Sequence, residues 1–111
     1  MSFKSSLRGA VYQAEKLLRE AIAAKYDYAD ARYQLGKILV ENGQLSEAIE
    51  QLETAANLDS EKDYIHYQLS VAYRRSSRIP DADRQLKIYQ QLKAKSRSET
   101  PAGMGTKKDV P

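Results

Sequence analysis

The chain has 111 residues and a formal net charge of +3, with 41% hydrophobic and 30% charged residues, a composition typical of one soluble globular domain. It contains no cysteine, which excludes disulfide scaffolds, thiolate catalysis and cysteine-ligated metals and leaves the cellular compartment open. No apolar run approaches the roughly 20 residues that span a bilayer, so no membrane partner is expected.

The first predicted element is an amphipathic helix within residues 6–26. Its apolar side chains recur every three or four residues, which places them on one helix face. The members of this face are Leu7, Val11, Ala14, Leu18, Ala21 and Ile22. We interpret this helix as the second half of a hairpin. Either the chain is a fragment of a longer array whose preceding helix covers this face, or another copy of the chain packs on it.

Residues 29–62 predict a helical hairpin. The segment 41–44, Glu-Asn-Gly-Gln, is typical of a turn. Apolar residues with helical spacing lie on both sides of it: Leu35, Ile38 and Leu39 before the turn, and Leu45, Ala48, Ile49, Leu52, Ala55 and Ala56 after it. Two antiparallel helices joined by a short turn are therefore expected.

Residues 63–95 predict a second hairpin of the same kind. The turn is expected at 76–78, and Pro80 suits the first turn of the following helix because its missing N–H costs nothing there. The apolar residues are Ile65, Leu69, Ala72 and Tyr73 before the turn, and Ala82, Leu86, Tyr89 and Leu92 after it.

Residues 96–111 have neither periodicity nor apolar mass, and we predict a disordered basic tail. The net charge is concentrated at this end, because basic residues outnumber acidic ones within 93–111 and the rest of the chain is neutral. A basic tail on a neutral body is typical of a solubilising extension, so no nucleic-acid partner is expected.

A shift of 34 positions relates the three helical segments. Tyr33-Gln34-Leu35-Gly36 recurs as Tyr67-Gln68-Leu69-Ser70. The same shift relates three alanines and three leucines: Ala14, Ala48 and Ala82, and Leu18, Leu52 and Leu86. The chain is therefore predicted to hold a half repeat at 6–26 and two whole repeats at 29–62 and 63–95.

These residues resemble the tetratricopeptide repeat, whose 34-residue unit places Leu-Gly in its first helix and Ala, Leu and Ala in its second. Leu35-Gly36 and Leu69-Ser70 fall at the Leu-Gly positions. The resemblance implies an all-α fold of about five helices, in which antiparallel hairpins stack as a short right-handed superhelix.

Several positions depart from the family pattern, among them the usual Pro, which is Tyr26, Ser60 or Ala94 here. Arg32 and His66 occupy the place of a bulky aromatic residue near the start of each unit. Tyr89 stands where a small alanine would admit a neighbouring helix, which indicates that the stack ends at this helix. The last helix also presents polar residues for its solvent side: Arg84, Lys87, Gln91 and Lys95.

The resemblance also implies that the first helix of each hairpin lines a concave groove that binds a peptide. This places seven candidate residues on the groove: Tyr33, Lys37, Tyr64, Tyr67, Val71, Arg74 and Arg75. Independently, Tyr64, Tyr67 and Val71 share one side of a helix, and tyrosine beside arginine is typical of recognition hot spots. We hypothesise a peptide whose apolar or aromatic residues stack on the tyrosines and whose acidic group meets Arg74 or Arg75.

Packing gives an alternative interpretation of several of these residues. Tyr33 and Tyr67 fit the core as well as the groove, and Tyr73 and Tyr89 are interpreted as packing residues. The arginines at the end of the fourth helix also suit a solvated C-terminus, where cations complement the helix dipole.

A subset of the family clamps the C-terminal carboxylate of chaperones with Lys, Asn and Arg. This chain has Gln34, Tyr64 and Gln68 at the matching places, so chaperone binding is not predicted.

No catalytic, cofactor or metal site is predicted. His66 is the only histidine, and without cysteine or a second histidine it lacks the partners that a zinc site or a nucleophile needs. We therefore predict an interaction module that binds a peptide or protein segment, and not an enzyme. The alternative is a structural element that forms a homo-oligomer through its uncapped N-terminal helix.

Overall fold

The computed structural model describes residues 3–25 and 28–98, and these residues form five α-helices and no strand. The helices are α1 (Phe3–Ala24), α2 (Ala29–Glu41), α3 (Leu45–Leu58), α4 (Asp63–Arg75) and α5 (Ile79–Ser98). The all-α prediction is confirmed. The last helix continues to Ser98, past the expected end at residue 95, and residues 99–111 of the predicted tail lie outside the described part of the chain.

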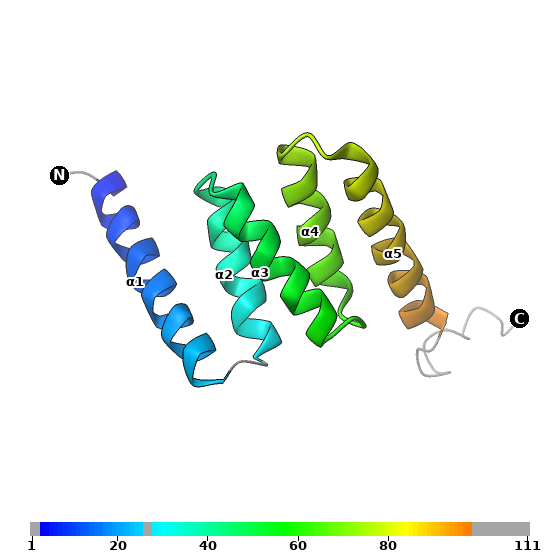
Figure 1. Cartoon of the computed structure of the whole chain (residues 1–111), viewed down its shortest axis with the longest axis horizontal. Helices are drawn as coiled ribbons and strands as arrows, with labels where there is room; N and C mark the ends of the chain where they lie inside the picture. Colours follow the sequence, from blue (N-terminus) through cyan, green and yellow to red (C-terminus); the bar gives the residue numbers. More distant parts are fainter. Residues whose placement is uncertain (1–2, 26–27, 99–111) are drawn as a thin grey trace, which may run out of the picture.

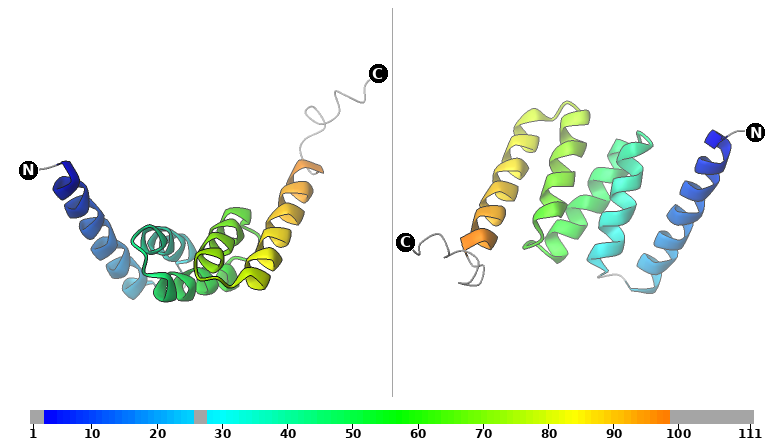
Figure 2. Two further views of the ribbon diagram at one scale, coloured as in Figure 1. Left: turned by 90° about the horizontal axis from the view of Figure 1, so that it is seen from above. Right: turned by 180° about the vertical axis from the view of Figure 1, so that it is seen from behind.

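The helices follow one another in a single row, and each runs antiparallel to the one before it (Figure 1). The row is elongated, 59 Å by 32 Å by 30 Å. It is also curved: α3 lies on the outer side of the bend, and α2 and α4 lie on the inner side (Figure 2).

The two hairpin turns have the same backbone geometry at equivalent positions. Gly43 has φ of 82°, and Ser77, which is 34 positions later, has φ of 64°. In each turn the residue immediately before the next helix donates its backbone N–H to the preceding helix. Gln44 N donates to Leu39 O at 2.9 Å, and Arg78 N donates to Tyr73 O at 2.8 Å. Glycine takes this left-handed conformation freely, whereas serine takes it at a cost.

The core of the row lies where α3 packs between α2 and α4. Leu52 is completely buried, and it lies against Gly36 of α2. A Cβ atom at Gly36 would lie only 2.5 Å from Leu52 Cγ, so the two helices approach closely at this point. The equivalent residues Leu18 and Leu86 are only half-buried, because α1 and α5 stand at the two ends of the row.

Two buried polar pairs repeat with the same spacing. Arg32 Nη1 donates to Gln51 Oε1 at 3.0 Å. His66 and Gln85 occupy the equivalent positions of the second hairpin, 34 residues later. His66 Nδ1 lies 2.7 Å from Gln85 Oε1. His66 Nε2 donates to the carbonyl oxygen of Ser60 at 2.9 Å. The departures from the family pattern at 32 and 66 are therefore satisfied by hydrogen bonds inside each hairpin.

One expectation about α1 is wrong. Leu18 and Ile22 were expected on an open apolar side, but both pack against the core beside α2, and Val11 is half-buried. The side chain of Leu7 lies outside the described part of the structure. Leu17 of this helix is exposed, with 61% of its surface accessible.

We expect Gly36→Ala to destabilise the fold by about 1–3 kcal/mol, because the added methyl group must displace Leu52 from a filled core. Gly9→Ala is the matched control: nothing lies within 4 Å of its new methyl group, so alanine should stabilise α1 slightly. Urea denaturation of both variants measures the difference. Equal loss of stability in the two variants would contradict the close approach.

We expect Gln85→Ala to cost about 1–3 kcal/mol, because it leaves the buried Nδ1 of His66 without its partner. Gln90→Ala, at an exposed position of the same helix, is the control and should change the free energy of unfolding by less than about 0.5 kcal/mol. Thermal unfolding followed by circular dichroism compares them. Indistinguishable midpoints would refute the role of the pair.

Candidate functional site

The predicted peptide-binding residues belong to α2 and α4, the two helices on the inner side of the curved row (Figure 2). Tyr33 and Lys37 lie on α2, and the other five residues lie on α4, so both inner helices contribute (Figure 2). Tyr64 and Tyr67 are 39% and 46% exposed, whereas Tyr33 is half-buried and packs against the core.

Tyr33 and Tyr64 form an aromatic pair between α2 and α4. Their ring centroids are 4.8 Å apart, and the planes meet edge to face at 62°. Lys37 Nζ lies 5.9 Å from the Tyr33 centroid, within the range of a cation–π contact. Burial, and secondarily the charge of Asp30, raises the pKa of Tyr33, so its hydroxyl stays protonated in the neutral pH range.

Tyr67 forms a second aromatic pair, with Tyr89 of α5. The centroids are 5.2 Å apart. Lys93 Nζ lies 6.0 Å from the Tyr89 centroid and 3.3 Å from Asp63 Oδ2. Tyr89 and Lys93 were not among the predicted site residues. The sequence contained a signal for Tyr89, because a large aromatic residue stands there where the preceding repeat has the small Ala55.

The structure does not bring Arg74 and Arg75 to one point. Arg75 Nη1 donates to the carbonyl oxygen of Val40 at 3.2 Å, so it ties the end of α4 to the end of α2. Arg74 Nη2 lies 3.8 Å from Asp83 Oδ1 of α5, and both side chains are exposed. Val71 is half-buried and packs against the core. Arg75 is held by a backbone carbonyl, whereas Arg74 contacts an exposed carboxylate. Arg74 is therefore the more accessible of the two for a ligand.

The chemical character of this face is aromatic with flanking cations. Two half-exposed tyrosine rings present apolar surface, and their hydroxyl groups add hydrogen-bonding capacity at the rim. Lys37 and Lys93 lie near the rings of Tyr33 and Tyr89. Lys93 is paired with Asp63, and Arg74 is paired with Asp83. Within residues 3–25 and 28–98, no group of three or more His, Asp or Glu side chains is arranged to hold a metal ion.

Comparisons with known proteins agree with this architecture. A sequence profile described as TPR repeat matches residues 36–76. This match includes the turn of the first hairpin and the whole of α3 and α4, and the described helices have the arrangement of a TPR-type fold. The crystal structure of MamA superposes with a TM-score of 0.75 and 24% identity over 81% of this chain and 53% of that chain. A MamA RS-1 ArsTM double mutant gives a TM-score of 0.76 and 26% identity over 81% of this chain and 51% of that chain.

The chain thus spans about half the length of the MamA structures that it matches. Among curated protein sequences, none matches it. The TPR match and the shared fold support a protein-interaction scaffold in general terms. None of the helices in the described ranges is long and apolar enough to cross a membrane.

A polar cluster joins α3, α4 and α5 of the TPR array. The Tyr73 hydroxyl donates to a carboxylate oxygen of Glu53, and the Arg78 guanidinium lies 4.6 Å from the Tyr73 ring centroid. Arg78 Nε also donates to Asp81 Oδ2 at 2.9 Å. Burial raises the pKa of Tyr73 far above its ordinary value, and the hydrogen bond to Glu53 adds to the increase. Tyr73 is therefore a packing residue, as its sequence position indicated.

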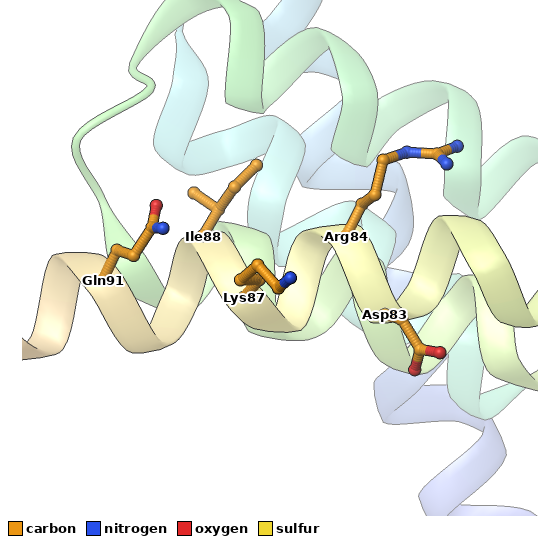
Figure 3. A pocket seen from close by; sticks show the side chains of 5 residues that line it. All are labelled: Asp83, Arg84, Lys87, Ile88 and Gln91. Carbon is orange, nitrogen blue, oxygen red and sulfur yellow. The ribbon is translucent and has the colours of Figure 1, made fainter.

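A hollow on the exposed side of α5 is lined by Asp83, Arg84, Lys87, Ile88 and Gln91. Figure 3 shows that Ile88 and Gln91 point to one side of the helix and Asp83 to another, so the polar groups do not converge on one point. All of these residues except Ile88 are exposed. The hollow is therefore interpreted as the solvent side of the last helix and not as a ligand site.

We expect the stability of the folded chain to fall above about pH 10, where an unfolded tyrosine ionises but folded Tyr73 keeps its proton. The contribution is complete below the unfolded pKa and is lost progressively above it. Tyr73→Phe should therefore reduce the alkaline slope of the unfolding free energy, and Tyr12→Phe, at a 67% exposed position, should leave it unchanged. Urea denaturation at a series of alkaline pH values measures the slopes. Equal slopes in the wild type and Tyr73→Phe would contradict the assignment.

Proposed function

We propose that the inner face of this TPR array binds an extended segment of a partner protein. Apolar or aromatic side chains of the segment pack on the two tyrosine pairs, and an acidic group of the segment meets Arg74. The observation that carries this proposal is the exposure of Tyr64 and Tyr67 on one inner helix, each already packed on one side by another tyrosine.

Pre-organised rings favour binding. A tyrosine brings a large contact area and has few rotatable bonds, so it loses little conformational entropy when a ligand covers it. The aromatic contacts at 4.8 Å and 5.2 Å already restrict the four rings before any ligand arrives. The conformational entropy that these side chains would lose on binding is therefore largely lost already on folding.

The charges support an acidic ligand. Arg74 faces Asp83 at 3.8 Å, and exposed pairs of this kind contribute little to stability, so a ligand carboxylate can replace the aspartate at small cost. A carboxylate also accepts two parallel hydrogen bonds from a guanidinium group. Arg75 is assigned to the connection between α4 and α2 because of its bond to Val40.

In this proposal the chain acts as a scaffold module and not as an enzyme. Its cations and tyrosines supply contacts, whereas the buried His66 is hydrogen-bonded to Gln85 and to the carbonyl oxygen of Ser60.

The test begins with peptides selected from a random library on the immobilised chain. We expect Tyr64→Ala and Tyr67→Ala each to weaken the selected peptides by about tenfold or more, the usual effect of removing a central aromatic contact. Tyr12→Ala is the control, because Tyr12 is more exposed than either residue and lies on α1. Fluorescence anisotropy measures the affinities. The proposal fails if Tyr12→Ala weakens binding as much as the two α4 variants do.

Arg74→Gln separates the electrostatic part of the proposal from the aromatic part. It should weaken acidic peptides more than neutral ones and reduce the salt dependence of binding. Arg84→Gln, which removes a similarly exposed arginine from α5, is the matched control. Equal effects of the two substitutions would exclude a specific role for Arg74.

A second candidate function is self-association through α1. The exposure of Leu17 at 61% favours it, because α1 packs against α2 within the described ranges and leaves this leucine accessible. Such a contact would make the chain a structural element of a homo-oligomer.

A further inference from the structure

A polar slot lies between α3 and α4. It has a volume of about 300 Å³, at the lower end of the range for small-molecule sites in proteins. On the α3 side it is lined by Glu53, Ala56 and Asn57, and by Ser60 just beyond the end of the helix. These positions have the three-and-four spacing of one helix face, so this wall extends over about two turns, or ~10 Å. We call this cavity the Glu53 slot.

Hydrogen bonds between the two walls define the ends of the slot. The lining residues of α4 are His66, Leu69 and Tyr73, which again share one helix face. At one end, His66 Nε2 donates to Ser60 O at 2.9 Å. At the other end, the Tyr73 hydroxyl donates to a carboxylate oxygen of Glu53. Ala56 and Leu69 lie between these ends, so the slot has a neutral polar end, an apolar middle and an anionic end.

The preceding repeat shows why the slot is open. Glu53 and Ala56 stand 34 positions after Arg19 and Ile22. Ile22 packs against the core, and Arg19 Nη1 donates to Glu47 Oε2 of α3 at 2.6 Å. In that repeat the chain itself therefore places an aliphatic side chain and a cation at these two positions. In the Glu53 slot, alanine leaves space and a carboxylate takes the position of the cation.

The charge of the slot favours a cationic ligand. Glu53 is half-buried, and it is the one carboxylate among the lining residues, which include no lysine or arginine. A carboxylate has about four lone-pair sites, so the bond from Tyr73 leaves Glu53 able to accept further hydrogen bonds. Arg78 lies close to the Tyr73 ring, at 4.6 Å from its centroid, but its Nε donates to Asp81 Oδ2 at 2.9 Å.

We infer that the Glu53 slot binds the side chain of an arginine of a partner protein. Such a side chain combines an aliphatic stem with a charged head, the same order of chemistry that the slot offers. The stem lies on Ala56 and Leu69, and the guanidinium group meets Glu53. A guanidinium group suits a carboxylate because its planar fork donates several hydrogen bonds at once. The partner's backbone lies at the other end, where Asn57 and Ser60 are exposed and offer hydrogen-bonding groups.

The slot is separate from the proposed peptide site. His66, Leu69 and Tyr73 line the slot, whereas Tyr64 and Tyr67 belong to the tyrosine pairs. With 3.6 residues per turn, the two sets lie about half a turn apart around α4, so they occupy opposite faces of the helix. The arginine slot therefore adds a second contact to the array, and its test does not depend on the outcome at the tyrosine pairs.

The test titrates the whole ¹⁵N-labelled chain with N-acetyl-arginine amide, a probe that carries the basic side chain without terminal charges. Two-dimensional NMR should show saturable shifts of the backbone amides around the slot. We expect a dissociation constant of about 1–10 mM, because a single side chain supplies few contacts. N-acetyl-citrulline amide has nearly the same shape without the charge, and it should bind at least tenfold more weakly.

Variants of α3 locate the binding. Glu53→Gln should weaken the probe at least tenfold, while it keeps an oxygen acceptor for the Tyr73 hydroxyl. Glu50→Gln is the matched control, because it removes the same charge at an exposed position of the same helix and should bind like the wild type. Ala56→Ile places the side chain of the preceding repeat in the slot and should abolish binding.

Circular dichroism verifies that each variant is folded, and the two glutamine variants decide the question if Ala56→Ile is not. Three results would overturn the inference: no saturable shifts in the wild type, equal affinities of Glu53→Gln and Glu50→Gln, or a citrulline probe that binds as tightly as the arginine probe.

Discussion

The close approach of α2 and α3 at Gly36 and Leu52 sets the spacing on which the rest of the repeat depends. Leu52 fills the space that a side chain at Gly36 would need, and it has no accessible surface. At that separation the small residues Ala48 and Ala55 of α3 are also completely covered. The second hairpin has Ser70 in place of the glycine, and its hydroxyl donates to the carbonyl oxygen of Tyr67 at 2.6 Å, so the polar group is satisfied within its own helix.

A buried polar contact accompanies this packing in both hairpins. Arg32 and His66 replace the bulky aromatic residue of the TPR pattern, and each bonds to a glutamine 19 positions later. A buried polar group is costly unless it has a partner, and the glutamine supplies that partner in each hairpin. In the described part of the chain, no buried side-chain nitrogen or oxygen lacks a hydrogen-bond partner.

The surface proposed for peptide binding uses residues that the core does not need. Tyr64 and Tyr67 are exposed on α4, while Ile65 and Leu69 of the same helix fill the core. This division is possible because a helix presents different residues to its two sides, so the stack and the binding face are specified by separate positions. The repeated unit therefore provides a rigid frame, and variation at solvent-facing positions gives the array its chemical character.

The sequence by itself determined the helical class, the 34-residue register and most of the core. Leu35, Leu39, Leu52 and Leu69 were identifiable because burial on a helix recurs every three or four residues, and this signal is local. Only the tertiary structure decided which side chains meet across helices. Arg74 and Arg75 are neighbours in the chain but contact Asp83 and the Val40 carbonyl on different helices, and Tyr67 meets Tyr89. The physical reason is that contacts between helices depend on their crossing geometry, which periodicity within a single helix does not encode.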